Sequence, residues 1–258
     1  MGQRISTTFP KIISSRQSNT LPIPPPSSYT APMSQTTSPT APADGASHKS
    51  IALITGSTRS PRVGPDVSAF VQSVLAPKLV GSPYTLAPVN LASWNLPLFN
   101  ENIMPAQLSV ENPTPGYTHQ LTRDWSTEIR KHDAIIFVTP QYNWGIPAAL
   151  KNAIDFLYHE WSGKPAIVVT YGGRGGDKVR DQLIQVLKSV KMNPVSVAPG
   201  LALGRNVAAA VTEGKMVPGQ AEEWAKNGAT DQIIAAWDEL IGALEKPKEV
   251  AKPKEEAK

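Results

Sequence analysis

The sequence predicts an α/β domain built on a parallel β-sheet. Apolar runs that fit buried strands alternate along the chain with amphipathic helical patterns. The clearest unit is 133–158, where the apolar run 134–138 is followed by a polar, aromatic loop and then by Pro147, a residue suited to the first position of a helix. Ligands of open α/β sheets bind at such loops, outside the carboxyl ends of the strands. We therefore expect a binding site at 140–144.

The elements follow from the apolar spacing and from the Gly and Pro residues between them. We expect five strands, at 51–55, 84–91, 134–138, 165–170 and 195–203, the last interrupted by Pro199 and Gly200. We expect five helices, beginning at Pro65, near His119, at Pro147, at Asp177 as a cap, and near Gln220, with the last continuous to Leu244.

This alternation predicts right-handed crossovers and a three-layer sandwich, with helices on both faces of the sheet. Five strands favour the flavodoxin-like order 2-1-3-4-5, in which strands 1, 3 and 4 are neighbours. The loops after these strands, at 56–64, 139–146 and 171–176, are the three that differ most from ordinary connections. We expect the three loops to converge on one crevice.

Composition divides the chain into three parts. Residues 1–48 are rich in Ser, Thr and Pro, and we expect a disordered leader there. Residues 49–245 would form the folded domain, and 246–258 a solvated Lys/Glu/Pro tail. Of 25 basic and 21 acidic residues, four basic and one acidic lie in 1–49, and five basic and three acidic lie in 246–258. The 16 basic and 17 acidic residues between them give no electrostatic reason to bind nucleic acid.

The leader leaves several interpretations open. Residues 1–6 fit the short N-myristoylation pattern, and the scarcity of acidic residues also fits an organelle transit peptide without a clear amphipathic face. Met33 is an alternative start that would remove most of the leader. No run approaches the roughly 18 apolar residues of a membrane span, and we expect a cytoplasmic, in part nuclear, protein. The absence of cysteine excludes disulfides and thiolate chemistry.

The first loop has the chemistry of a phosphate site. It contains hydroxyl groups, two arginines (Arg59 and Arg62) and the N–H groups of a helix N-terminus, which suit a terminal phosphate monoester. It lacks both the dinucleotide pattern G-x-G-x-x-G and the NTPase pattern G-x-x-x-x-G-K-[ST]. The alternative is an ordinary polar turn with surface arginines.

The other two loops suit a planar ligand. Tyr142 and Trp144 could pack along a ring while Asn143 binds its edge, although such aromatic residues are as often packing residues. The glycines around Arg174 allow close backbone approach; a single-copy RNA-binding Gly-Arg element is the alternative. None of the four histidines has metal-ligand spacing, so we expect no metal site. The chemistry therefore points to a cofactor.

These motifs, taken together, resemble the NAD(P)H-dependent FMN reductase family. The segments that carry the likeness are G-S-T-R at 56–59, P-Q-Y-N-W-G-I-P-A-A-L-K-N-A-I-D at 140–155 and Y-G-G-R-G-G at 171–176. The run 158–166 is similar to the fungal flavin-dependent quinone reductases of that family. The resemblance covers about 50–245 and implies a flavodoxin-like fold, tightly bound FMN, and NADPH or NADH as co-substrate. It also implies hydride transfer to quinones or related acceptors by a ping-pong mechanism.

The resemblance implies roles for thirteen residues and no catalytic side chain. Ser57, Arg59, Arg62, Val63 and Gly64 would hold the FMN phosphate; Pro140, Gln141, Tyr142 and Asn143 would line the isoalloxazine; Tyr171, Gly172, Gly173 and Arg174 would approach its pyrimidine edge. The first loop departs from relatives that end it in serine–phenylalanine–asparagine, because it has Arg62-Val63-Gly64. Phe99, Trp144 and His159 could shape the acceptor site or simply pack.

Two other functions remain open at this stage, a flavodoxin-type electron carrier and a non-catalytic interaction module that uses the proline-rich leader. The family also implies a homodimer or a dimer of dimers. The large residues at 158–161, Tyr-His-Glu-Trp, exceed what one sheet face requires and favour an interface there.

Overall fold

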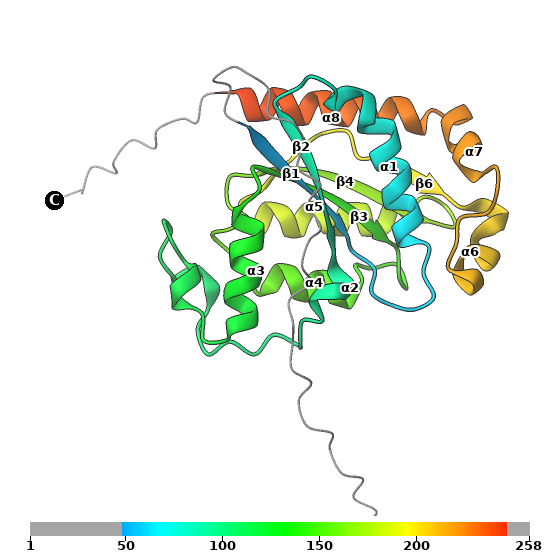
Figure 1. The fold of residues 1–258 in the computed structure, drawn as a ribbon. Coiled ribbons are helices and arrows are strands. Elements are labelled where there is room, and N and C mark those ends of the chain that lie inside the picture. Colours follow the sequence, from blue (N-terminus) through cyan, green and yellow to red (C-terminus); the bar gives the residue numbers. More distant parts are fainter. Residues whose placement is uncertain (1–47, 247–258) are drawn as a thin grey trace, which may run out of the picture. The chain divides into compact units, whose positions relative to one another are not determined.

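The computed structural model of the chain describes residues 48–246. The expected leader and tail therefore lie outside the described residues, apart from His48 and Lys246. The described part is a parallel sheet of order β2-β1-β3-β4-β5 (Figure 1), which confirms the predicted order. Its long strands are β1 (Lys49–Thr55), β2 (Tyr84–Asn90), β3 (Ala134–Pro140) and β4 (Pro165–Gly172).

The central strands are buried on both faces. Every residue of β3 is buried, and β1 pairs with it from Ile51 opposite Ala134 to Thr55 opposite Val138. Alternate residues of these strands contribute to two separate apolar clusters, one on each side of the sheet. The edge strand β2 is only partly buried, and there it accommodates Pro88, which cannot donate a backbone hydrogen bond.

Two helices cover one face of the sheet (Figure 1), α1 (Gly64–Leu79) and α8 (Ala229–Glu245). Pro65 lies in the first turn of α1, as predicted. Three helices cover the other face, α3 (Gln120–Arg130), α4 (Ala148–Asp155) and α5 (Asp177–Ser189). No helix in 48–246 is long and apolar enough to cross a membrane.

The helix α4 is shorter than the spacing of its apolar residues predicts. It begins after Pro147, which is its N-cap, and ends at Asp155, while Leu157 is buried just beyond its end. Trp161 is fully buried against the ring of Phe137 and donates its indole N–H to Ile154 O at 3.0 Å. Trp161, which counted toward the apolar surface expected at an interface, therefore belongs to the protein's own core, and the interface itself stays a prediction.

The fifth strand divides into two short pieces, β5 (Asn193–Pro194) and β6 (Gly200–Ala202), and both pair with β4. The prediction of one strand at 195–203 was wrong in extent. Proline at 194 and 199 removes two backbone donors from this segment, so a continuous ladder cannot form.

The C-terminal region also differs from the prediction of one helix from Gln220 to Leu244. It forms α7 (Gln220–Lys226) and α8, separated at Gly228, whose φ of 79° is left-handed. Two helices were not predicted, α2 (Leu91–Trp94) and α6 (Val207–Glu213). Three 3₁₀ turns lie within 48–246: η1 (Pro105–Gln107), η2 (Thr114–Gly116) and η3 (Gly204–Asn206).

Candidate functional site

A pocket of about 410 Å³ opens at the carboxyl ends of β1, β3 and β4. Residues from all three expected loops line it, so the predicted convergence is confirmed. Ten of the thirteen expected site residues are in its wall, together with three that were not expected. The ten are Arg59, Arg62, Val63, Pro140, Gln141, Tyr142, Asn143, Tyr171, Gly172 and Gly173; the others are Leu203, Val207 and Val211.

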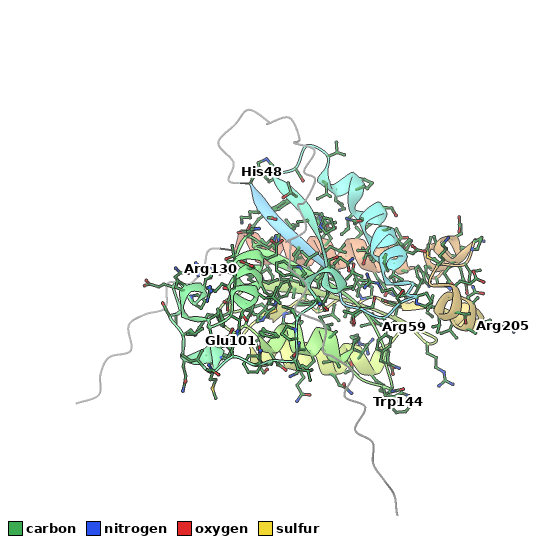
Figure 2. The ribbon with its side chains drawn as sticks, turned by 60° about the horizontal axis from the view of Figure 1, so that its bottom comes forward. His48, Arg59, Glu101, Arg130, Trp144 and Arg205 are labelled. Carbon is green, nitrogen blue, oxygen red and sulfur yellow. The ribbon has the colours of Figure 1, made fainter. Side chains whose placement is uncertain are left out.

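Both arginines of the first loop line this pocket. Arg62 is braced within the protein, because its guanidinium donates to the backbone oxygen of Ser57 and, at 3.0 Å, to Oδ1 of Asn90. Arg59 lies at the surface of the pocket, where Nη2 donates to the backbone oxygen of Val211 at 2.8 Å. Arg59 and Trp144 lie on the same side of the view in Figure 2, opposite His48 and Arg130.

Ser57 and Gly64 lie behind the wall of the pocket. A Cβ atom on Gly64 would lie 2.1 Å from Ser57 Oγ and 2.8 Å from the hydroxyl of Tyr171, which does line the pocket. The Ser57 hydroxyl is fully buried beside the Tyr171 hydroxyl, whose pKa it tends to lower, and it forms no regular hydrogen bond in the described part of the chain. A buried hydroxyl without a partner is costly, so this position suits an acceptor oxygen supplied by a ligand.

The second loop is a tight hairpin turn. Tyr142 and Gly145 exchange two backbone hydrogen bonds, of 3.2 and 2.8 Å, across Asn143 and Trp144. The two central residues have φ of 46° and 66°, which is the geometry of a type I′ turn. Asparagine tolerates this conformation, whereas tryptophan rarely adopts it. Trp144 is nevertheless held there with 68% of its surface exposed, beside a pocket to which Asn143 contributes.

Gln141 joins the second loop to the third. Its side-chain oxygen accepts hydrogen bonds from the backbone N–H groups of Lys178, at 3.0 Å, and Val179, at 3.2 Å, in the first turn of α5. The prediction that Asp177 caps this helix was wrong: Gly176 is the N-cap, and no side chain of its own caps the helix. Gln141 therefore satisfies two of the free donors that every helix leaves at its start.

The glycines of the third loop divide into two pairs. Gly175 and Gly176 have φ of 87° and 82°, and a Cβ on Gly175 would lie 3.3 Å from the backbone of Gly200, so this pair serves the turn itself. Gly172 and Gly173 line the pocket, and a Cβ on Gly173 would meet no protein atom within 4 Å. Arg174 is exposed and is not in the pocket wall.

A fourth wall was not predicted. It consists of Leu203, Val207 and Val211, which are spaced at intervals of four residues, and the last two lie on α6. This spacing is the one signal in the sequence that indicates a single apolar helix face. The alanines at 208–210 do not mark the opposite face of the helix as polar, because alanine is common on both faces of helices.

The side chains that line the pocket offer positive charge and hydroxyl groups. Four of them are titratable, Arg59, Arg62, Tyr142 and Tyr171, and the wall contains no carboxylate or imidazole. Burial raises the pKa of Tyr171 above its ordinary value of 10, against the smaller effects of Ser57 and the two arginines, so its hydroxyl stays protonated at neutral pH. Within 48–246 no group of three His, Asp or Glu residues could hold a metal ion.

The sheet order, the parallel strands and a ligand-sized pocket where the order reverses define an α/β protein of the flavodoxin-like class. Residues 50–203 match the NADPH-dependent FMN reductase family, and the chain belongs to that family. The resemblance carried by the three loop motifs is thereby confirmed.

Two fungal relatives and one bacterial relative illustrate the match. The chain is 37% identical over 202 residues to NAD(P)H-dependent FMN reductase ntnL of Nectria sp., an alignment that covers 77% of this chain and 98% of the relative. It is 47% identical over 150 residues to NAD(P)H-dependent FMN reductase LOT6 of Saccharomyces cerevisiae, with coverage of 56% and 76%. A quinone reductase of Pseudomonas putida is 35% identical over 146 residues, with coverage of 52% and 69%.

Solved structures support the fold. FerB, described as a flavoenzyme NAD(P)H:(acceptor) oxidoreductase from Paracoccus denitrificans, aligns with a TM-score of 0.55 over 76% of this chain and 98% of its own. At 22% sequence identity, this likeness shows a shared fold and nothing further.

Proposed function

We propose that this protein is an FMN-dependent oxidoreductase that transfers hydride from NADPH or NADH, through bound FMN, to quinones or related acceptors in a ping-pong sequence. The observation that carries the proposal is one pocket whose wall combines two arginines with glycine backbone and residues of a hairpin turn. The family of the chain and the names of its relatives, FMN reductases and quinone reductases, agree with this chemistry.

The FMN phosphate would lie at the first loop. Arg59 donates one hydrogen bond within the described residues, to Val211 O, so other donors among its five N–H groups remain for phosphate oxygens. The buried Ser57 hydroxyl, which forms no regular hydrogen bond within the described residues, is a further donor of the same loop. Arg62 would act mainly through its charge, because it already braces Ser57 and Asn90. These residues would fix the cofactor by its terminal phosphate.

The isoalloxazine would lie against the second and third loops. The space in front of Gly173 is free of protein atoms within 4 Å of a Cβ position, which leaves room for a flat ring to approach the backbone. Pro140 to Asn143 would border the opposite side, where the hydrogen bonds that the Gln141 oxygen accepts from α5 tie this loop to the helix. A preformed planar slot orients a ring at little cost in entropy.

In this assignment the protein supplies binding, orientation and exclusion of water. Bound FMN would supply the redox chemistry, accepting hydride from NAD(P)H and giving it to the second substrate. Val63, Leu203 and Val207 place apolar surface around the pocket, which excludes water from it. The protonated Tyr171 hydroxyl acts as a donor and not as a base. Its neighbours in the wall include no carboxylate or imidazole that could take up a proton.

The visible spectrum of the purified protein tests the proposal. We expect flavin absorbance bands that bleach when NADH or NADPH is added without oxygen and that return when a quinone is added. An electron carrier of the flavodoxin type would keep its bands in the presence of NAD(P)H, and an interaction module would show none. Either of these two results would contradict the proposed activity.

We further propose a homodimer or dimer of dimers located in the cytoplasm. Apolar side chains that lie exposed on the connection between α2 and α3 support association with a second copy: Leu98, Met104 and Val110 are 82%, 64% and 75% exposed. Light scattering at micromolar concentration should give at least twice the mass of one chain, and a monomer mass would contradict the proposal. Imaging of the full-length chain fused to a fluorescent protein tests the location.

A further inference from the structure

One segment, 203–216, runs from the third loop to the first and forms the fourth wall of the pocket; we call it the strap. Its start is tied to the third loop by two backbone hydrogen bonds. Leu203 N donates to Gly172 O at 2.8 Å, and Gly204 N donates to Gly173 O at 3.1 Å. Both acceptors belong to residues that line the pocket.

The far end of the strap is tied to the first loop and to α1. Arg59 donates to Val211 O at 2.8 Å, and the backbone N–H of Met216 donates to Asp66 Oδ2 at 2.7 Å. Gly214, with φ of 69°, packs so closely that a Cβ would lie 2.6 Å from both Arg62 N and Pro61 Cβ. The strap is therefore fastened at both ends to the two loops that flank the second loop.

Between these ends, α6 presents Val207 and Val211 to the pocket while Ala210 is buried against the core. The two valines are one helical turn apart, or about 6 Å along the axis. Val211 keeps 40% of its surface exposed in the pocket, so a ligand there would cover apolar area. The match to the family ends at residue 203, the first residue of the strap, so the rest of the strap lies outside the matched segment.

We propose that the strap retains the cofactor, with Arg59 as the residue that couples it to the phosphate. This inference rests on the proposed binding of FMN and adds that the monophosphate is held by a wall which must detach before the flavin leaves. Arg59 is placed to contact both the strap and a bound phosphate, since it lines the pocket and donates to Val211 O of the strap. Its guanidinium can bind Val211 O and phosphate oxygens at the same time, because it carries five N–H donors.

The coupling has a physical basis in α6. Val211 O is one of the last four carbonyl groups of that helix, which have no partner within the helix, and a cation there is favoured by the helix dipole. A bound phosphate would fix the Arg59 side chain and so strengthen its hold on Val211. By linkage, a strap that phosphate stabilises must in turn stabilise bound phosphate by the same free energy.

The test compares two glycines with the same backbone conformation. Gly214→Ala forces a Cβ into Arg62 and Pro61 and should detach the strap, whereas Gly219→Ala has a similar positive φ of 83° and no atom within 4 Å of the added Cβ. A second pair of substitutions replaces aspartates in the first turns of two helices. Asp66→Ala removes the acceptor of Met216 N, and Asp231→Ala is its control, because Asp231 is an exposed residue at the start of α8.

Flavin fluorescence after rapid dilution of the FMN-loaded protein gives the rate of FMN release. We expect Gly214→Ala and Asp66→Ala to release FMN about tenfold faster than their controls, since variants of one site differ mainly in dissociation rate. Rates within twofold of the controls for both pairs would overturn the proposal. A parent protein that binds no FMN would overturn it together with the proposed function, whereas normal binding with unchanged release would overturn the strap alone.

Hydrogen exchange on the unaltered protein provides a second test, which does not depend on whether a variant folds. We expect FMN to slow exchange of the backbone amides at 207–216 at least about fivefold more than riboflavin does, because only FMN has the phosphate that reaches Arg59. Equal protection by the two ligands would show that Arg59 does not couple phosphate to the strap, and would overturn the proposal.

Discussion

The side-chain oxygen of Gln141 lies 3.0 Å from the backbone nitrogen of Lys178 and accepts its hydrogen bond. These residues are 37 positions apart, on the second loop and the first turn of α5. The contact holds two of the three loops of the pocket at a fixed separation. It also replaces the cap that the helix lacks, because Gly176 has no side chain.

Removing this acceptor should destabilise the fold as well as the site. Gln141→Leu leaves two helix donors without a partner, and we expect the free energy of unfolding to fall by about 1–2 kcal/mol. Gln141→Glu keeps an acceptor and adds a charge that the helix N-terminus favours, so it should retain the parent's stability at neutral pH. Urea unfolding of the two variants and the parent, all without flavin, measures these changes in stability. Equal losses in the two variants would show that the hydrogen bonds do not carry the effect.

Arg59→Ala should weaken FMN binding and leave riboflavin binding nearly unchanged. The loss of a charge-assisted contact to phosphate predicts a reduction of roughly 1.5–3 kcal/mol in binding free energy, or about ten- to a hundredfold in Kd. Arg205→Ala is a matched control, because Arg205 is an exposed arginine of the strap that does not line the pocket (Figure 2). Fluorescence titration gives the four affinities, and an equal loss of riboflavin affinity in Arg59→Ala would contradict the placement of the phosphate.

Gly173→Val should weaken FMN and riboflavin alike, because the added side chain would occupy the space proposed for the ring. The fold itself should tolerate the change, since a Cβ at this position meets no protein atom within 4 Å and the residue does not have a positive φ. We therefore expect the melting temperature of the flavin-free variant to stay within a few degrees of the parent. Unchanged affinity for both flavins would contradict the placement of the ring against the third loop.

How much the sequence could predict depends on how local each feature is. The strands β1, β3 and β4 are continuous apolar runs, and the loop motifs follow them directly, so the convergence of Arg59, Tyr142 and Gly173 followed from strand order alone. The cap on α5 was not predictable in this way. Its acceptor, Gln141, comes from a different loop, while a local candidate, Asp177, stands at the helix start.

The C-terminal region shows the same limit. The break at Gly228 depends on whether a glycine inside a helical pattern adopts a left-handed conformation, and tertiary packing decides this. The strap was missed because its two valines stand among alanines, and only the tertiary structure shows that Val207 and Val211 line the pocket while Ala210 lies in the core. The residue types of 158–161 suggested an interface, yet the largest of them, Trp161, packs in the core against Phe137.

Trp144→Gly should make the protein more stable and its site less effective. A tryptophan at φ of 66° in a type I′ turn is strained by roughly 1 kcal/mol relative to glycine, and Asn-Gly is the sequence that this turn prefers. We expect the free energy of unfolding to rise by about 0.5–1 kcal/mol, because the side chain is mostly exposed and loses only its contact with Lys178. The KM for NAD(P)H or quinone should rise, since Trp144 directly follows Asn143, which lines the pocket. A fall in stability would show that the tryptophan packs more than it strains.

Glu128 should make stability depend on acid pH. A hydrogen bond from His132 and then the hydrogen bond and charge of Lys131 outweigh burial and lower the pKa of Glu128 from 4.5 to about 2. His132 Nδ1 in turn meets Ser50 Oγ at 2.8 Å, which links the end of α3 to β1.

A carboxylate whose pKa is lower in the folded state contributes stability above its unfolded value. This contribution, roughly 2 kcal/mol after allowance for its partial exposure, should therefore be complete above about pH 5 and should disappear as the pH falls from 4.5 towards 2.

Glu128→Gln should remove that contribution at pH 7 and flatten the decline in stability below pH 5, whereas Glu111→Gln, at an exposed position, should do neither. Urea unfolding of the three proteins at pH 7, 5 and 3 measures the difference. The difference in free energy of unfolding between the parent and Glu128→Gln should be largest at pH 7, because Glu128 becomes protonated in both the folded and the unfolded parent at low pH. A gap that widened on acidification would mean that the carboxylate is destabilised by folding, with the sign of the pKa shift reversed.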